Sequence, residues 1–89
     1  MTELESLRKD IDSIDRKIVR LLEERMEISR KVGEYKSANN IPILDTQREK
    51  DVIKSRADML ENREYEGVVT EIFELVMRIS RECQGRVRG

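Results

Sequence analysis

The chain has 89 residues, of which 42% are charged and 37% hydrophobic, and its aromatic residues are two Tyr and one Phe. A chain of this length forms a single domain, residues 1–89, and so few aromatic residues exclude an aromatic-rich core. Lys and Arg total 18 against 19 for Asp and Glu. Without a basic stripe or stacking aromatics, the composition argues against nucleic acid as a partner.

No stretch of the sequence suits a membrane or an export signal. Apolar runs fall well short of the roughly 18 residues of a membrane span, and the residues after Met1 do not resemble a signal peptide. Cys83 is the only cysteine, so no disulfide can form within the chain. These features predict a cytoplasmic protein without a membrane partner.

The first expected helix covers about residues 3–39 and carries a continuous apolar stripe. Its members recur at spacings of three and four, provided that position 25 is counted, as in a helix that packs along a narrow seam. They are Leu4, Leu7, Ile11, Ile14, Ile18, Leu21, Ile28, Val32 and Tyr35. The helix should end near Asn39-Asn40, because Asn tolerates a left-handed cap and Ile41-Pro42 enforces an extended segment.

A helix of this length is a rod of roughly 54 Å, at 1.5 Å per residue. A compact domain of this size has a diameter of only about 30 Å. The rod cannot be covered by its own chain, so a second copy in a two-fold dimer is the simplest partner.

Two shorter helices are expected after the first. The second covers about residues 45–62 and is capped by Thr46, in a capping box with Glu49, or by Asp45. The third covers about residues 65–84, and Gly85 should stop it. The pattern therefore predicts an all-α fold with one long and two medium helices.

Two basic residues on the first helix are candidates for an anion site. Arg25 occupies a stripe position, where a charge needs an anionic partner, an ion pair with a Glu, or an escape to solvent. Lys36 points within about 20° of the same direction and lies roughly 16 Å along the axis. The two long side chains could close around a small anion, although Lys36 can also be an ordinary helix-end lysine.

Further polar candidates lie along the chain. Arg8, at the edge of the stripe, is some 25 Å from Arg25 and could approach its site only from an antiparallel second copy; otherwise it is solvated. Glu49 opens the second helix beside Arg48, and Ser80 lies one turn before Gln84, which is otherwise a frayed terminal residue. With no His and one Cys, neither a transition-metal site nor a His-dependent nucleophile is expected.

These residues fall in an ordered series of short blocks from Leu4 to Gln84. The blocks are Leu7-Arg8, Ile11-Asp12-Ser13-Ile14-Asp15, Leu21-Leu22-Glu23-Glu24-Arg25, Val32-Gly33-Glu34-Tyr35-Lys36, Pro42-Ile43-Leu44-Asp45, Arg48-Glu49 and Ser80-Arg81-Glu82-Cys83-Gln84. Together they resemble the AroQ class of chorismate mutases. The resemblance implies an intertwined homodimeric helical bundle with sites shared between subunits, and an isomerase that converts chorismate to prephenate in phenylalanine and tyrosine biosynthesis, a branch of the shikimate pathway.

The resemblance also implies roles for individual residues, without a metal or cofactor. Arg25 would bind one carboxylate of chorismate, and Arg8 of the partner subunit would bind the other. Lys36 and Gln84 would be the catalytic pair that hydrogen-bonds the ether oxygen of the breaking bond.

The remaining matched positions would bind the rest of the substrate. Glu49 would receive the ring hydroxyl with help from Asp45, and Arg48 and Ser80 would support the site. An isochorismate-pyruvate lyase of the same fold is an alternative, which Asp45 and Glu49 disfavour because the hydroxyl sits elsewhere in isochorismate. A non-catalytic helical dimerisation module explains the stripe but not Arg25 within it.

Overall fold

The computed structural model of the chain describes residues 2–88, and within that range all regular structure is helical. The elements are α1 (Glu3–Ala38), α2 (Thr46–Ala57), the short 3-10 helix η1 (Arg63–Tyr65) and α3 (Glu66–Arg88). The prediction of an all-α fold is confirmed. Within the same range, no helix is both long and apolar enough to pass through a bilayer.

Both ends of α1 follow from local sequence. The hydroxyl of Thr2 accepts a hydrogen bond of 3.1 Å from the backbone N–H of Glu5, which satisfies one of the free donors at the helix start. At the other end Asn39 caps the helix, and Asn40 has a φ of 54°, in the left-handed region that Asn tolerates. The predicted end of the first helix is confirmed.

The second helix is shorter than the sequence suggested, ending at Ala57 rather than near residue 62. The backbone carbonyl of Ala57 accepts a hydrogen bond of 2.8 Å from Nη1 of Arg63, so a side chain from beyond the helix caps its last turn. The side chain of Asn62 then accepts from the N–H of Glu64, 3.0 Å away, and starts η1. The Arg63 side chain therefore caps the end of α2 and the Asn62 side chain caps the start of η1, and the residues between the two helices form a turn.

The third helix continues through Gly85 to Arg88, so the prediction that Gly85 stops it is wrong. A glycine ends a helix when it adopts the left-handed conformation, and no glycine in residues 2–88 has a positive φ. Inside a helix, glycine costs only about 1 kcal/mol relative to alanine, which packing of the helix can offset.

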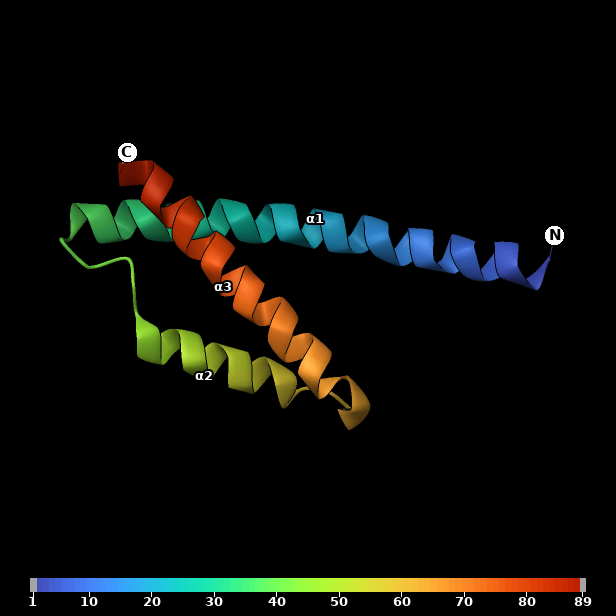
Figure 1. Cartoon of the computed structure of the whole chain (residues 1–89). Helices are drawn as coiled ribbons and strands as arrows, with labels where there is room; N and C mark the ends of the chain where they lie inside the picture. Colours follow the sequence, from blue (N-terminus) through green and yellow to red (C-terminus); the bar gives the residue numbers. More distant parts are fainter. Residues whose placement is uncertain (1, 89) are drawn as a thin grey trace.

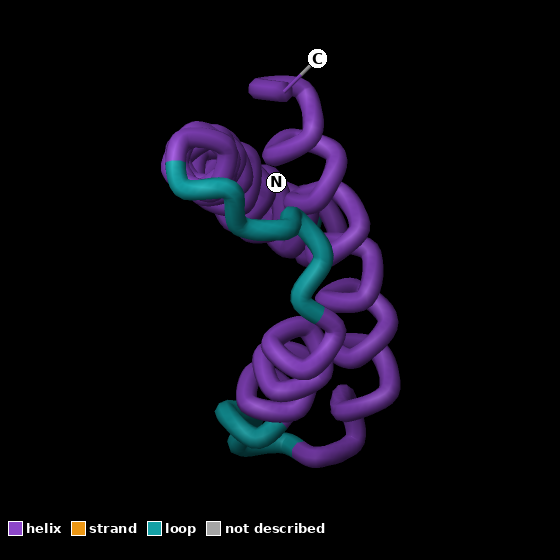
Figure 2. Tube along the Cα trace, turned by 90° about the vertical axis from the view of Figure 1, so that its left-hand side faces the viewer, coloured by secondary structure: helices purple, strands orange, loops and turns teal. Residues whose placement is uncertain are grey.

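The helices form an open arrangement in which α3 alone contacts both of the others (Figure 1). The C-terminal part of α3 crosses α1, and its N-terminal part lies along α2, while the N-terminal half of α1 projects beyond both. Seen along α1, the chain has the outline of a C, with α1 and α2 as its two arms (Figure 2). The molecule measures 56 × 25 × 15 Å, with a radius of gyration of 16.4 Å. A compact chain of this length would have a radius near 12 Å.

Very little of the chain is buried by its own packing. The buried hydrophobic side chains of the described residues are Val52, Ala57 and Met77, from α2 and α3. The apolar stripe of α1 is open to solvent, with exposed fractions of 56% at Leu4 and 61% at Leu21. The rod is therefore uncovered within one chain, as its length predicted.

The crossing of α1 and α3 depends on Gly33, which is buried. A Cβ atom at this position would lie 2.7 Å from both the Cα and the carbonyl oxygen of Gln84. Because these are backbone atoms, the clash cannot be relieved by a rotamer change. Gly33 thus permits the close approach that brings Gln84 against α1.

We expect Gly33→Ala to lower the free energy of unfolding by about 2 kcal/mol, since the two helices must separate to admit the methyl group. Gly67→Ala is the matched control, because nothing lies within 4 Å of a Cβ added there and alanine favours the helix. Urea denaturation of both variants at one protein concentration measures the difference. Equal stability of the two variants would contradict this account of the crossing.

Candidate functional site

A pocket of about 510 Å³ lies in the space enclosed by the C-terminal half of α1, the connection that follows it, α2 and α3. This volume suits a small organic ligand. The lining consists of Arg25, Ile28, Ser29, Val32, Lys36, Ile43, Asp45, Arg48, Glu49, Val52, Met77, Ser80, Arg81 and Gln84.

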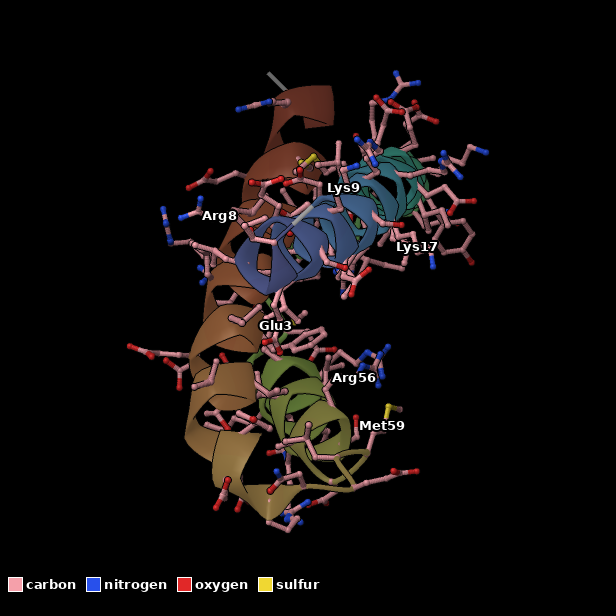
Figure 3. All side chains as sticks on the ribbon, turned by 90° about the vertical axis from the view of Figure 1, so that its right-hand side faces the viewer. Glu3, Arg8, Lys9, Lys17, Arg56 and Met59 are labelled. Atoms are coloured by element: carbon pink, nitrogen blue, oxygen red, sulfur yellow. The ribbon has the colours of Figure 1, made fainter. Side chains whose placement is uncertain are left out.

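The pocket gathers all of the predicted site residues except Arg8. Those on its lining are Arg25, Lys36, Asp45, Arg48, Glu49, Ser80 and Gln84. Arg8 lies on the exposed, projecting half of α1 (Figure 3). Within one chain, therefore, Arg8 is separate from the pocket, as its distance along the helix indicated.

Arg25 is half-buried, and its charge is not neutralised by a carboxylate of the described chain. Its Nη1 donates a hydrogen bond of 2.5 Å to Oγ of Ser80. Burial lowers the pKa of Arg25 below its usual value, and the nearby positive charges of Arg56 and Arg48 lower it further. The expected alternative, an ion pair with a Glu, does not form within residues 2–88. The site therefore favours an anion beside Arg25.

Lys36 points into the same pocket as Arg25, as the helical rotation predicted. Its Nζ donates a hydrogen bond of 2.9 Å to the backbone carbonyl of Ile43, in the connection between α1 and α2. An ammonium group has three donors, so this contact orients Lys36 and leaves two N–H groups for a ligand.

Gln84 reaches the pocket from α3, next to the crossing at Gly33. Its Oε1 is buried and has no hydrogen-bond partner among the described residues. A buried polar group without a partner costs free energy, and such groups often mark a place where a ligand binds. The amide oxygen of Gln84 is thus available to a hydrogen-bond donor in the pocket.

Asp45 and Glu49 are held at the start of α2. Oδ1 of Asp45 accepts a hydrogen bond of 3.0 Å from the backbone N–H of Arg48, so Asp45, rather than Thr46, caps the helix. Glu49 lies one turn later and is mostly buried on the pocket side. Both carboxylates therefore lie on the same pocket lining as Lys36 and Gln84.

Basic side chains outnumber acidic ones on the pocket lining. The basic residues are Arg25, Lys36, Arg48 and Arg81, and the acidic ones are Asp45 and Glu49. A partly desolvated pocket with excess positive charge attracts anions strongly, because the interaction is screened less than at an open surface. This arrangement can hold a small molecule that carries two negative charges and also has a hydroxyl group.

The sequence did not single out two polar residues of the site. Arg81 places its Nε 2.8 Å from Oε2 of Glu49, and Ser29 is buried on the α1 wall. Helical spacing could have found both, since Arg81 precedes Gln84 by three residues and Ser29 follows Arg25 by four.

The family model described as chorismate mutase type II matches residues 7–85 of the chain. The chain is 38% identical over 87 residues to a bifunctional chorismate mutase/prephenate dehydratase of Aquifex aeolicus, a match that covers 98% of this chain and 18% of that protein. It is 34% identical over 83 residues to a chorismate mutase of Methanocaldococcus jannaschii, covering 92% of this chain and 84% of that one. The chain thus spans less than a fifth of the bifunctional relative and most of the archaeal one.

The fold of the chain is also similar to that of a solved structure. A conserved hypothetical protein from Pyrococcus furiosus superimposes with a TM-score of 0.79 and is 37% identical in sequence. The superposition covers 94% of this chain and 97% of that chain.

We expect Arg25→Met to raise the free energy of unfolding of the unliganded protein slightly, because it removes a partly desolvated charge that other arginines repel, an effect that solvent screening keeps small. The sign follows from the lowered pKa of Arg25, which means that the folded state disfavours the charged form. Arg30→Met is the matched control, since Arg30 is exposed on the same helix and pairs with Glu27 and Glu34. Chemical denaturation without ligand measures both, and a loss of stability in Arg25→Met larger than in the control would contradict this view of the site.

Proposed function

This chain belongs to the chorismate mutase type II family, and we propose on that premise that it is an isomerase that rearranges chorismate to prephenate in the pocket between α1, α2 and α3. The observation that carries the proposal is the meeting of Arg25, Lys36 and Gln84 in one pocket whose lining has an excess of positive charge. Chorismate is a dianion with an ether oxygen and a ring hydroxyl, and the pocket offers a complementary group for each.

The residue types suit this reaction. In the rearrangement one C–O bond breaks and one C–C bond forms within the same molecule, so no nucleophile, metal or redox cofactor is needed. The protein has to hold the flexible ether in its compact reactive conformer, which charge-assisted hydrogen bonds to the carboxylates achieve. It also has to stabilise negative charge that develops on the ether oxygen in a site shielded from water.

Lys36 and Gln84 are the residues that stabilise the ether oxygen. The contact of Nζ of Lys36 with the carbonyl of Ile43 fixes the direction of the ammonium group without using all of its donors. Gln84 contributes a neutral amide donor from the opposite wall, which stays a donor at any pH. Two donors fixed before the reaction stabilise the developing charge without a reorganisation cost.

The other contacts orient the substrate. Arg25 binds one carboxylate, held in place through its hydrogen bond to Ser80. Glu49 accepts the hydrogen bond of the ring hydroxyl, assisted by Asp45, and Arg48 adds positive charge at the start of α2.

A second copy of the chain completes the site. The exposed apolar stripe of α1 is the surface through which two chains pair, in an intertwined homodimer with antiparallel first helices. This pairing carries Arg8 of the partner subunit to the pocket, where it binds the second carboxylate. The enzyme is expected to act in the cytoplasm, the reducing compartment that suits the lone Cys83.

The proposal is tested by incubating the purified chain with chorismate and, separately, with isochorismate, and following both the loss of substrate and the products. We expect prephenate from the wild type. Lys36→Ala should lose at least about 3 kcal/mol of transition-state stabilisation, which is about 100-fold in rate. Lys31→Ala, an exposed lysine on the same helix, is the control and should keep full activity.

Three other results would contradict the proposal or one of its residue assignments. Release of pyruvate from isochorismate, with chorismate unchanged, would replace the proposal by the lyase activity. A wild type that leaves both substrates unchanged would leave only a helical dimerisation module. Near-normal turnover by Lys36→Ala would remove Lys36 from the mechanism.

A further inference from the structure

One ion pair on the pocket lining joins α2 to α3. Nε of Arg81 on α3 lies 2.8 Å from Oε2 of Glu49 on α2. Every other ion pair in residues 2–88 joins residues that are near in sequence, and all of those lie on exposed side chains. The Arg81–Glu49 pair is therefore the charged link that ties α2 to α3 in the described chain.

This link matters because α2 has no contact of its own with α1. The helix packs against α3 alone, where the buried side chains Val52 and Met77 set the spacing between the two helices. Apolar packing is not directional, so it does not set the direction of the Glu49 carboxylate. The oppositely charged Arg81 on α3 does set the direction of this carboxylate.

The geometry leaves one oxygen of Glu49 for a ligand. Oε2 is the Glu49 oxygen paired with Arg81, and Oε1 accepts no hydrogen bond from residues 2–88. The side chain of Glu49 is 20% exposed and lines the pocket, so its carboxylate lies within reach of a bound molecule. The N–H of Arg81 at Nε is not aligned with Oε2, so the contact is an ion pair that can tighten when a ligand occupies the site.

We propose that Arg81 is a positioning residue: it holds Oε2 of Glu49, so that Oε1 receives the hydroxyl group of the substrate. The proposal rests on the proposed function, because it assigns to Glu49 the ring hydroxyl of chorismate. It adds a residue that acts on the substrate through Glu49 rather than by contact. Since the hydroxyl does not take part in bond making or breaking, Arg81 contributes to binding in the ground state and the transition state alike.

The test compares Arg81→Met with Arg78→Met. Met keeps most of the length of the stem without the charge, and Arg78 lies one turn earlier on α3 in an exposed pair with Glu82. For Arg81→Met we expect kcat/KM for chorismate to fall about tenfold, mostly through a higher KM, since uniform binding is lost. Arg78→Met should stay within about twofold of the wild type. Equal values for the two variants, or a fall confined to kcat, would overturn the proposal.

A double-mutant cycle separates positioning from direct contact. Once Glu49→Gln has removed the carboxylate, Arg81→Met should cost less than about twofold more, because its partner is already absent. A full additional loss would mean that Arg81 binds a substrate carboxylate itself, and would contradict the positioning role. Arg81→Lys, which keeps the charge, should recover kcat/KM to within about threefold of the wild type, and a Lys variant as impaired as Met would also count against the proposal.

Folding and the underlying activity are controlled separately. Thermal unfolding of each variant shows whether it folds, and Arg81→Gln replaces Arg81→Met in both comparisons if the Met variant does not. Wild type that fails to convert chorismate would refute the proposed function. Active wild type with an unaffected Arg81 variant would refute only the role of Arg81.

Discussion

The apolar stripe of α1 is the constraint on which the rest of the molecule depends. Thirty-six residues form one helix of a chain whose other helices cover only its C-terminal half (Figure 1). Burial of one Leu or Ile side chain is worth roughly 2 kcal/mol, and the stripe leaves several of them in water. In the proposed homodimer a second chain covers this stripe, so association adds to stability as well as completing the site.

In the pocket, by contrast, several groups lower the stability of the unliganded chain and favour ligand binding. Arg25 is partly desolvated and repelled by Arg48 and Arg56, and Gln84 keeps a buried oxygen without a partner. Both features are unfavourable in the unliganded chain. An anionic ligand relieves the first, and a hydrogen-bond donor relieves the second. Sites that bind charged molecules commonly hold such groups in place before the ligand arrives. The close crossing at Gly33 holds the backbone of Gln84 against α1 at this site.

Helical periodicity explains why much of the molecule could be predicted from the sequence. The spacing of Arg25 and Lys36 fixes their directions on a continuous helix, and both line the pocket. The alternating stripe and the length of the rod predicted an uncovered helix in the single chain, which the exposure of Leu4 and Leu21 confirms. These predictions needed only local geometry.

What the sequence did not reveal depends on contacts between elements. The end of α2 at Ala57 is decided by the guanidinium of Arg63, and the pairing of Arg81 with Glu49 by how α2 packs on α3. Gly85 remained helical because a low helix propensity does not by itself end a helix. The role of Gly33 was also missed, since a close helix crossing has no signature within one segment.

The central claim is that neither copy of the chain holds a complete site, and mixing two inactive variants tests it most directly. In an Arg8→Ala and Lys36→Ala heterodimer, one pocket combines Lys36 from the first chain with Arg8 from the second and escapes both substitutions. The account predicts that an equimolar mixture regains chorismate mutase activity, up to about a quarter of the wild-type value if subunits exchange at random. No recovery after subunit exchange has been verified by mass would contradict it.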